Sequence, residues 1–176
     1  EKEHLNEAVT ELRARGLRGA LEITWLAQPT LSQLQRQLRR EQYHILHFVG
    51  HGMFDVQQDE GALLFEDENG GRHLVSASIL GALLRDHSSL RLAVLNACEG
   101  ARSGQEDPFA GVAPTLVRSG LPAVAAMQFE ISDEAAIIFA REFYGALADG
   151  YAVNSALAEA RKAIFASGNE IEWGTP

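Results

Sequence analysis

The sequence predicts an α/β protein built on a mostly parallel sheet that helices cover on both faces. Helix-like and strand-like segments alternate along the chain, and the strands are nearly unbroken apolar runs, best seen at 44–49 (HILHFV) and 90–97 (LRLAVLNA). Such runs are typical of parallel sheets buried on both faces. In these sheets functional sites lie beyond the carboxyl ends of the strands, which is where chemistry is expected here.

Further elements follow from hydrophobic spacing and punctuation. Apolar residues at helical spacing predict helices at 1–15, 77–85, 109–118, 133–148 and 153–166. A further helix is expected to begin after Thr30 as its N-cap, with Leu31, Leu34 and Leu38 on one face. β-rich runs predict two more strands, ALEITWL at 20–26 and AVAAM after Pro122. Two short runs, ALLFED and RHLVS, flank Asn69-Gly70-Gly71 and predict a small β-hairpin insertion.

The composition is that of a folded chain of ordinary domain size. It has 176 residues, 46% hydrophobic and 22% charged, and a formal net charge of -9, which disfavours nucleic acid and anionic membranes as partners. No apolar run approaches the ~20 residues needed to span a bilayer. The single cysteine, Cys98, excludes an internal disulfide and favours a reducing, cytoplasmic environment.

Two candidate catalytic residues follow the two best strands. His51 comes after Val49, between two glycines, and Cys98 comes after Leu95. If these strands are neighbours, about 4.8 Å apart, both side chains emerge at one edge. A Cys–His pair supports nucleophilic thiol chemistry, in which the imidazole takes the thiol proton and returns it to a leaving amine. The backbone N–H groups of Gly52 and Cys98 are candidate oxyanion donors.

Each residue also has a plainer interpretation. His51 alone is more often a surface or hydrogen-bonded histidine, Cys98 alone is more often a small buried hydrophobe, and the flanking glycines turn the chain. The catalytic hypothesis depends on both residues falling at the same edge.

The same residues carry a family resemblance. HFVGHG at 47–52 resembles the His-Phe-x-Gly-His-Gly signature of CHAT domains, which belong with caspases, separase and gingipain-type peptidases, and LNACEG at 95–100 resembles their nucleophile motif. Weaker similarities lie at 111–120, at 127–133 with Phe129 in place of the usual Trp, at 143–144 and at 156–161. The resemblance covers almost the whole chain.

The resemblance implies a caspase-like three-layer α/β/α sandwich and a cysteine endopeptidase that cleaves a protein or peptide in a regulated signalling or defence pathway. His51 is then the general acid/base and Cys98 the nucleophile. The rival hypothesis is a catalytically inactive caspase-like module for protein–protein interaction. In related peptidases the residue two before the Cys often lines the primary pocket, where an Asp selects Arg or Lys. That residue is Asn96 here, so an uncharged residue is expected before the scissile bond.

Other acidic and histidine residues allow further interpretations. Asp133 is a second candidate for the substrate pocket, although beside Ser132 it also fits a helix start. His44 and His47 lie three apart in a predicted strand and point to opposite faces, so no metal site is expected. A flavodoxin-like ligand binder needs a phosphate loop, which the sequence lacks, and no cofactor is expected. The acidic stretch at 55–68 reads as a solvated hairpin surface or, alternatively, as a surface for a basic partner.

Residues 1–176 are expected to form a single domain that is incomplete at both ends. It starts in a helix and stops at 173–176, which resembles the start of a further strand, so the family's first and last strands are expected outside it. CHAT domains commonly follow tetratricopeptide repeats or nucleotide-binding modules, which implies an upstream sensor. The polar loop at 99–107 is expected to need ordering by a partner, or else to be a plain surface loop.

Overall fold

The computed structural model describes residues 5–6, 10, 21–55, 59–97, 111–129 and 131–176. The chain divides into two compact units, one formed by residues 26–129 and the other by residues 1–25 together with 130–176. They are described in turn.

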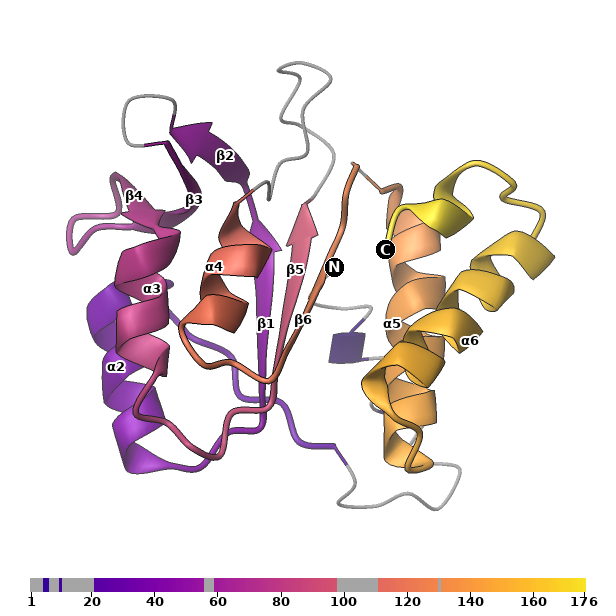
Figure 1. Cartoon of the computed structure of the whole chain (residues 1–176), viewed down its shortest axis with the longest axis horizontal. Coiled ribbons are helices and arrows are strands. Elements are labelled where there is room, and N and C mark those ends of the chain that lie inside the picture. Colours follow the sequence, from indigo (N-terminus) through magenta and orange to yellow (C-terminus); the bar gives the residue numbers. More distant parts are fainter. Residues whose placement is uncertain (1–4, 7–9, 11–20, 56–58, 98–110, 130) are drawn as a thin grey trace. The chain divides into compact units, whose positions relative to one another are not determined.

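A parallel sheet is the centre of the unit 26–129 (Figure 1). Its strands are β1 (Ile45–Gly50), β5 (Leu92–Ala97) and β6 (Ala123–Ala126), in the order β1-β5-β6. Helices α2 (Leu31–Arg40), α3 (Ala77–Leu84) and α4 (Val112–Arg118) lie to one side of this sheet. The middle of β5 is completely buried, as its apolar run predicts. The α/β class and the mostly parallel sheet are therefore confirmed.

Helices α2 and α3 begin where the sequence provides capping residues. Thr30 caps α2, with its Oγ1 accepting a hydrogen bond of 3.2 Å from the backbone N–H of Gln33, and Leu34 and Leu38 are buried beneath it. Ser76 caps α3 in the same way. These caps satisfy backbone donors that have no partner within the helix. The predicted starts of both helices are confirmed.

A second, antiparallel sheet contains the predicted hairpin. Strands β3 (Glu60–Glu66) and β4 (Arg72–Ser76) pair around a turn in which the Asp67 carboxylate accepts 2.8 Å hydrogen bonds from the N–H groups of Asn69 and Gly71. Gly70 has a φ of 79°, which glycine adopts most easily. The strand β2 (Gly52–Asp55), which pairs with β3, was not predicted, because four residues after a Gly-His-Gly turn are too few to show a period.

The predicted strand at 20–26 is wrong for its described part. Residues 21–26 form no strand, and in the described part of the chain no strand pairs with them. A strand requires a ladder partner, whatever its β propensity. Most of the predicted helix at 1–15 lies outside the described residues, among which Leu5, Asn6 and Thr10 are helical.

The described C-terminal part of the other unit consists of helices α5 (Asp133–Ala148) and α6 (Val153–Ala166) and the short 3-10 helix η1 (Glu172–Gly174). The bounds of both long helices were predicted. They pack against each other, and Phe139 and Phe143 on α5 and Ala156 and Ala160 on α6 are almost completely buried. The sequence at 173–176 resembles the approach to a strand, but its first two residues belong to the 3-10 helix η1.

The carboxylate of Glu172 ties η1 to the start of α5. It accepts hydrogen bonds of 2.6 Å from the Ser132 N–H and 2.7 Å from the Ser132 hydroxyl, and a third from the Asn169 amide. Ser132 is itself the N-cap of α5 and accepts from the Ala135 N–H. This part of the molecule therefore has a helix start whose polar groups are bonded to one another. No helix in the described residues is both long and apolar enough to cross a bilayer.

Candidate active site

The strand register brings the two candidate motifs together. In the parallel pair β1–β5, Gly50 lies opposite Ala97, and these are the residues that directly precede His51 and Cys98. Neighbouring parallel strands lie about 4.8 Å apart, so β1 and β5 end side by side at the carboxyl edge of the sheet. The described part of β5 ends at Ala97, so Cys98 and the loop 99–107 lie outside the described residues.

The backbone of His51 is anchored between the two sheets. Its carbonyl accepts a 2.9 Å hydrogen bond from the N–H of Leu64 on β3, and the next residue, Gly52, begins β2 and pairs with Leu63. Gly52 is buried. His51 is therefore the link at which the chain passes from the parallel sheet into the antiparallel one.

The imidazole of His51 has a feature that packing alone does not explain. Its Nδ1 atom is buried and, within the described part of the chain, has no hydrogen-bond partner. Leaving a buried polar atom unsatisfied costs about 1–3 kcal/mol, and such atoms in native proteins call for a specific reason. A nitrogen kept from water and from other hydrogen bonds remains available to a thiol or a substrate.

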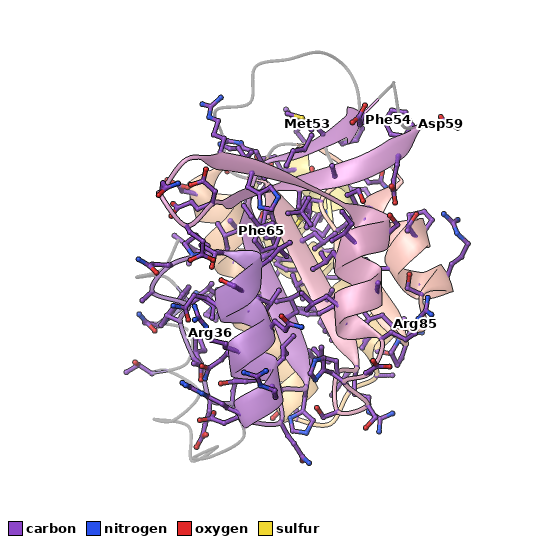
Figure 2. The ribbon with its side chains drawn as sticks, turned by 90° about the vertical axis from the view of Figure 1, so that its left-hand side faces the viewer. Arg36, Met53, Phe54, Asp59, Phe65 and Arg85 are labelled. Carbon is purple, nitrogen blue, oxygen red and sulfur yellow. The ribbon has the colours of Figure 1, made fainter. Side chains whose placement is uncertain are left out.

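The packing of Phe48 explains why position 50 is a glycine. A Cβ atom at Gly50 would lie 2.9 Å from Cζ of Phe48, whose ring folds over this glycine. The same ring packs against Phe65 of β3, with 5.5 Å between ring centroids, and Phe65 is labelled in Figure 2. Phe48 and Gly50 thus form one packing unit directly before His51. The sequence did not reveal Phe65 as the third member, because it is distant in the chain.

The two residues implied as pocket residues lie in different units. Asn96 lies on β5 opposite Val49 and is 2% exposed, in the strand that leads to Cys98. Asp133 lies in the unit that contains 130–176, as the exposed first residue of α5, directly after the cap Ser132. Its position is that of a helix start, where a carboxylate is favoured by the helix dipole. The pocket roles of both residues stay predictions.

Three members of the acidic stretch at 55–68 make hydrogen bonds within the chain. Glu60 accepts a 2.6 Å bond from the N–H of Ser78 in the first turn of α3, and Glu68 accepts from the Ser32 hydroxyl in the first turn of α2. The N–H groups of Gly71 and Asn69 lower the pKa of Asp67, since they stabilise its carboxylate. These bonds favour the solvated hairpin surface over a surface built for a basic partner.

An exposed aromatic side chain follows β6, the third strand of the parallel sheet. Leu95 lies opposite Ala126 in the pair β5–β6, and three residues beyond Ala126 the side chain of Phe129 is 60% exposed. The sequence singles out Phe129 only as a replacement for Trp. As for metals, the described residues contain no group of three or more His, Cys, Asp or Glu side chains placed to hold an ion.

The structure has a parallel sheet, a histidine directly after its first strand β1, and an antiparallel sheet that follows this histidine in the chain. This arrangement is consistent with the caspase-like class of α/β proteins. The sequence matches the model of the CHAT domain family over residues 2–171. The chain therefore belongs to the CHAT domain family, a family related to caspase-like peptidases. A comparison with curated proteins gives no significant match.

Proposed function

We propose that this chain is a cysteine endopeptidase in which Cys98 is the nucleophile and His51 the general acid/base. The observation that carries the proposal is the register of β1 and β5, in which the residues directly before His51 and Cys98 lie opposite each other. The Nδ1 atom of His51 supports it further, because it is buried and has no hydrogen-bond partner among the described residues, and a general base needs a nitrogen with no other hydrogen bond.

The reaction follows from the chemistry of these groups. The ring of His51 takes the thiol proton, and the Cys98 thiolate attacks the carbonyl carbon of the peptide bond. The N–H groups of Gly52 and Cys98 donate to the oxyanion that forms. His51 then gives its proton to the departing amine, the C–N bond breaks and a thioester remains. Water, deprotonated by His51, hydrolyses the thioester and releases the acid and free Cys98.

The substrate is a protein or peptide, and the neutral Asn96 favours an uncharged residue before the cleaved bond. We place the enzyme in a regulated signalling or defence pathway, under an upstream sensor module in the same protein. The family relationship supports this setting.

The test is cleavage of a diverse peptide library, read by mass spectrometry. Cys98→Ala and His51→Ala are expected to abolish cleavage, and covalent labelling by a peptidyl electrophile is expected to require Cys98. His73→Ala is the matched control, because His73 is an exposed histidine on β4. Cleavage by Cys98→Ala at the wild-type rate contradicts the proposal. Labelling of Cys98 without cleavage of any peptide favours the inactive interaction module.

A further inference from the structure

A cavity of about 290 Å³ lies in the unit 26–129, away from the candidate active site. Its walls come from the end of α3, the turn 85–91, the end of α4 and the segment 119–122. Arg91 directly precedes β5 and Pro122 directly precedes β6, so the cavity lies at the amino ends of these strands. His51 follows the opposite end of β1, and six residues of strand separate the two edges by about 20 Å.

The floor of the cavity is apolar and closely packed. Four leucines line it, each at most 7% exposed: Leu84, Leu90, Leu116 and Leu121. Gly81 and Ser119 fix the distance between α3 and α4, because a Cβ at position 81 would lie 2.7 Å from the Cβ of Ser119. A contact with so little room holds the two helices in one relative position. The floor of the cavity is therefore set by the packing of the core.

The rim of the cavity is basic. Arg85 and Arg91 line it and are exposed, and neither makes an ion pair with any residue in the described ranges. His87 and Ser88 add further polar groups between them. The neighbouring acid, Asp86, does not line the cavity. Two guanidinium groups with no ion pair among the described residues thus border a pocket with an apolar floor, in a chain whose net charge is -9.

The ordinary reason for a basic residue at this end is the helix dipole, which favours cations in the last turn of a helix. That reason covers Arg39, Arg40 and Arg118, which lie in the last turns of α2 and α4, and extends to Arg85, the C-cap of α3. Arg91 lies outside any helix, so the dipole does not account for it. Figure 2 shows Arg85 at the foot of α3, far from Met53 and Phe54 of β2.

We propose that this cavity binds a small organic anion, with its apolar body on the leucine floor and its carboxylate or phosphate held by Arg85 and Arg91. The volume corresponds to the smallest common ligand pockets, which begin near ~300 Å³. A guanidinium matches a carboxylate or phosphate in a two-pronged geometry, and two of them suit one anionic group. The site is separate from the proposed peptidase site and does not depend on it.

The probes for the test are benzoate and phenyl phosphate, with benzamide as a neutral molecule of the same shape. Binding to the chain is measured by isothermal titration and located by amide chemical shifts. Both anions are expected to saturate and to shift the amides of 81–91 and 116–122, and their relative affinities separate a carboxylate site from a phosphate site. Arg85→Gln and Arg91→Gln are each expected to weaken binding about tenfold, because each removes a charge-assisted hydrogen bond.

Arg36→Gln is the matched control, since it removes the same charge from an exposed position of α2 outside the cavity (Figure 2). It is expected to change the affinity less than about twofold. The proposal is overturned if benzamide binds as tightly as benzoate, if Arg36→Gln weakens binding as much as the rim variants, or if neither anion saturates by about 10 mM. Thermal unfolding checks that each variant is folded, and Arg85→Met and Arg91→Met, which also remove the charge, replace any glutamine variant that is not.

Discussion

The polar groups at the start of α5 and the His51 side chain at the end of β1 differ in how their hydrogen bonds are satisfied. At the start of α5, Ser132 and Glu172 bond to each other, and Asn169 bonds to the same carboxylate. At the end of β1, the buried Nδ1 of His51 has no hydrogen-bond partner within the described part of the chain. The first arrangement satisfies its polar groups within the fold, whereas the second leaves a buried nitrogen without a partner among the described residues. The first centre is bonded within the fold, and the second is the one for which we propose a catalytic role.

The largest expected effect tests the His51 side of this comparison. His51→Ala is expected to lower peptide cleavage by about 10³-fold or more, because it removes the group that activates the nucleophile. Its free energy of unfolding is expected to change little, since the buried Nδ1 of the lost side chain has no hydrogen-bond partner in the described ranges. The measurements are kcat/KM on a cleaved peptide and urea unfolding. A loss of stability comparable to the loss of activity assigns His51 a structural role instead.

Gly50→Ala is expected to have the next largest effect, because it alters the packing that precedes His51. The new methyl group meets the Phe48 ring at 2.9 Å and forces it away from Phe65. Overpacking of this kind typically costs about 1–3 kcal/mol of stability. Phe48→Leu in the Gly50→Ala background is expected to recover part of the loss, which urea unfolding of the single and double variants measures. Unchanged stability in Gly50→Ala contradicts the packing account.

The sequence predicts what depends on local pattern. The capped start of α2, the start of α3, the hairpin turn at 69–71 and the bounds of α5 and α6 all follow from neighbouring residues, and the structure confirms them. The register of β1 and β5 is also consistent with the matching apolar runs that end near His51 and Cys98.

What depends on distant partners escaped the sequence. The run at 20–26 has β propensity but no described ladder partner, and the short β2 exists because β3 pairs with it. The contact between Phe48 and Phe65 and the bond between Ser132 and Glu172 join residues 17 and 40 positions apart, and no local pattern announces such pairs. The geometry of Cys98 relative to His51 belongs to the same class and remains a prediction.

A smaller effect is expected from a substitution at Asn96, two residues before the proposed nucleophile Cys98. Asn96→Asp is expected to raise cleavage after Arg or Lys about tenfold relative to cleavage after uncharged residues, since it supplies a counter-charge to a basic side chain. The measurement compares kcat/KM for matched peptides that differ only at the residue before the cleaved bond. Because Asn96 is 2% exposed, circular dichroism must show that the variant folds. A folded variant with unchanged selectivity removes Asn96 from the pocket.

The smallest expected effect tests the other side of the comparison, the satisfied helix start. Glu172→Gln is expected to lower the free energy of unfolding at neutral pH by about 1 kcal/mol, the typical worth of a helix cap. Glu170→Gln is the control, because Glu170 is an exposed carboxylate two residues away on the same turn. Thermal unfolding of the two variants at pH 7 gives the difference. Equal stability of both variants shows that the bonded carboxylate adds nothing to the fold.

The pH dependence of the stability of Glu172→Gln shows whether folding lowers or raises the pKa of Glu172. Burial alone raises the pKa of Glu172, but the hydrogen bonds from Ser132 and Asn169 outweigh it and lower the pKa below its ordinary value of 4.5. A carboxylate with a lowered pKa contributes stability that is fully present above pH 4.5 and is lost as the pH falls through the pKa of the folded state. The gap in melting temperature between wild type and Glu172→Gln is therefore expected to be constant from pH 7 to pH 5 and to close below pH 4.5. A gap that widens on acidification means that Glu172 is protonated more easily in the folded chain, and the bonds to Ser132 are then not its main influence.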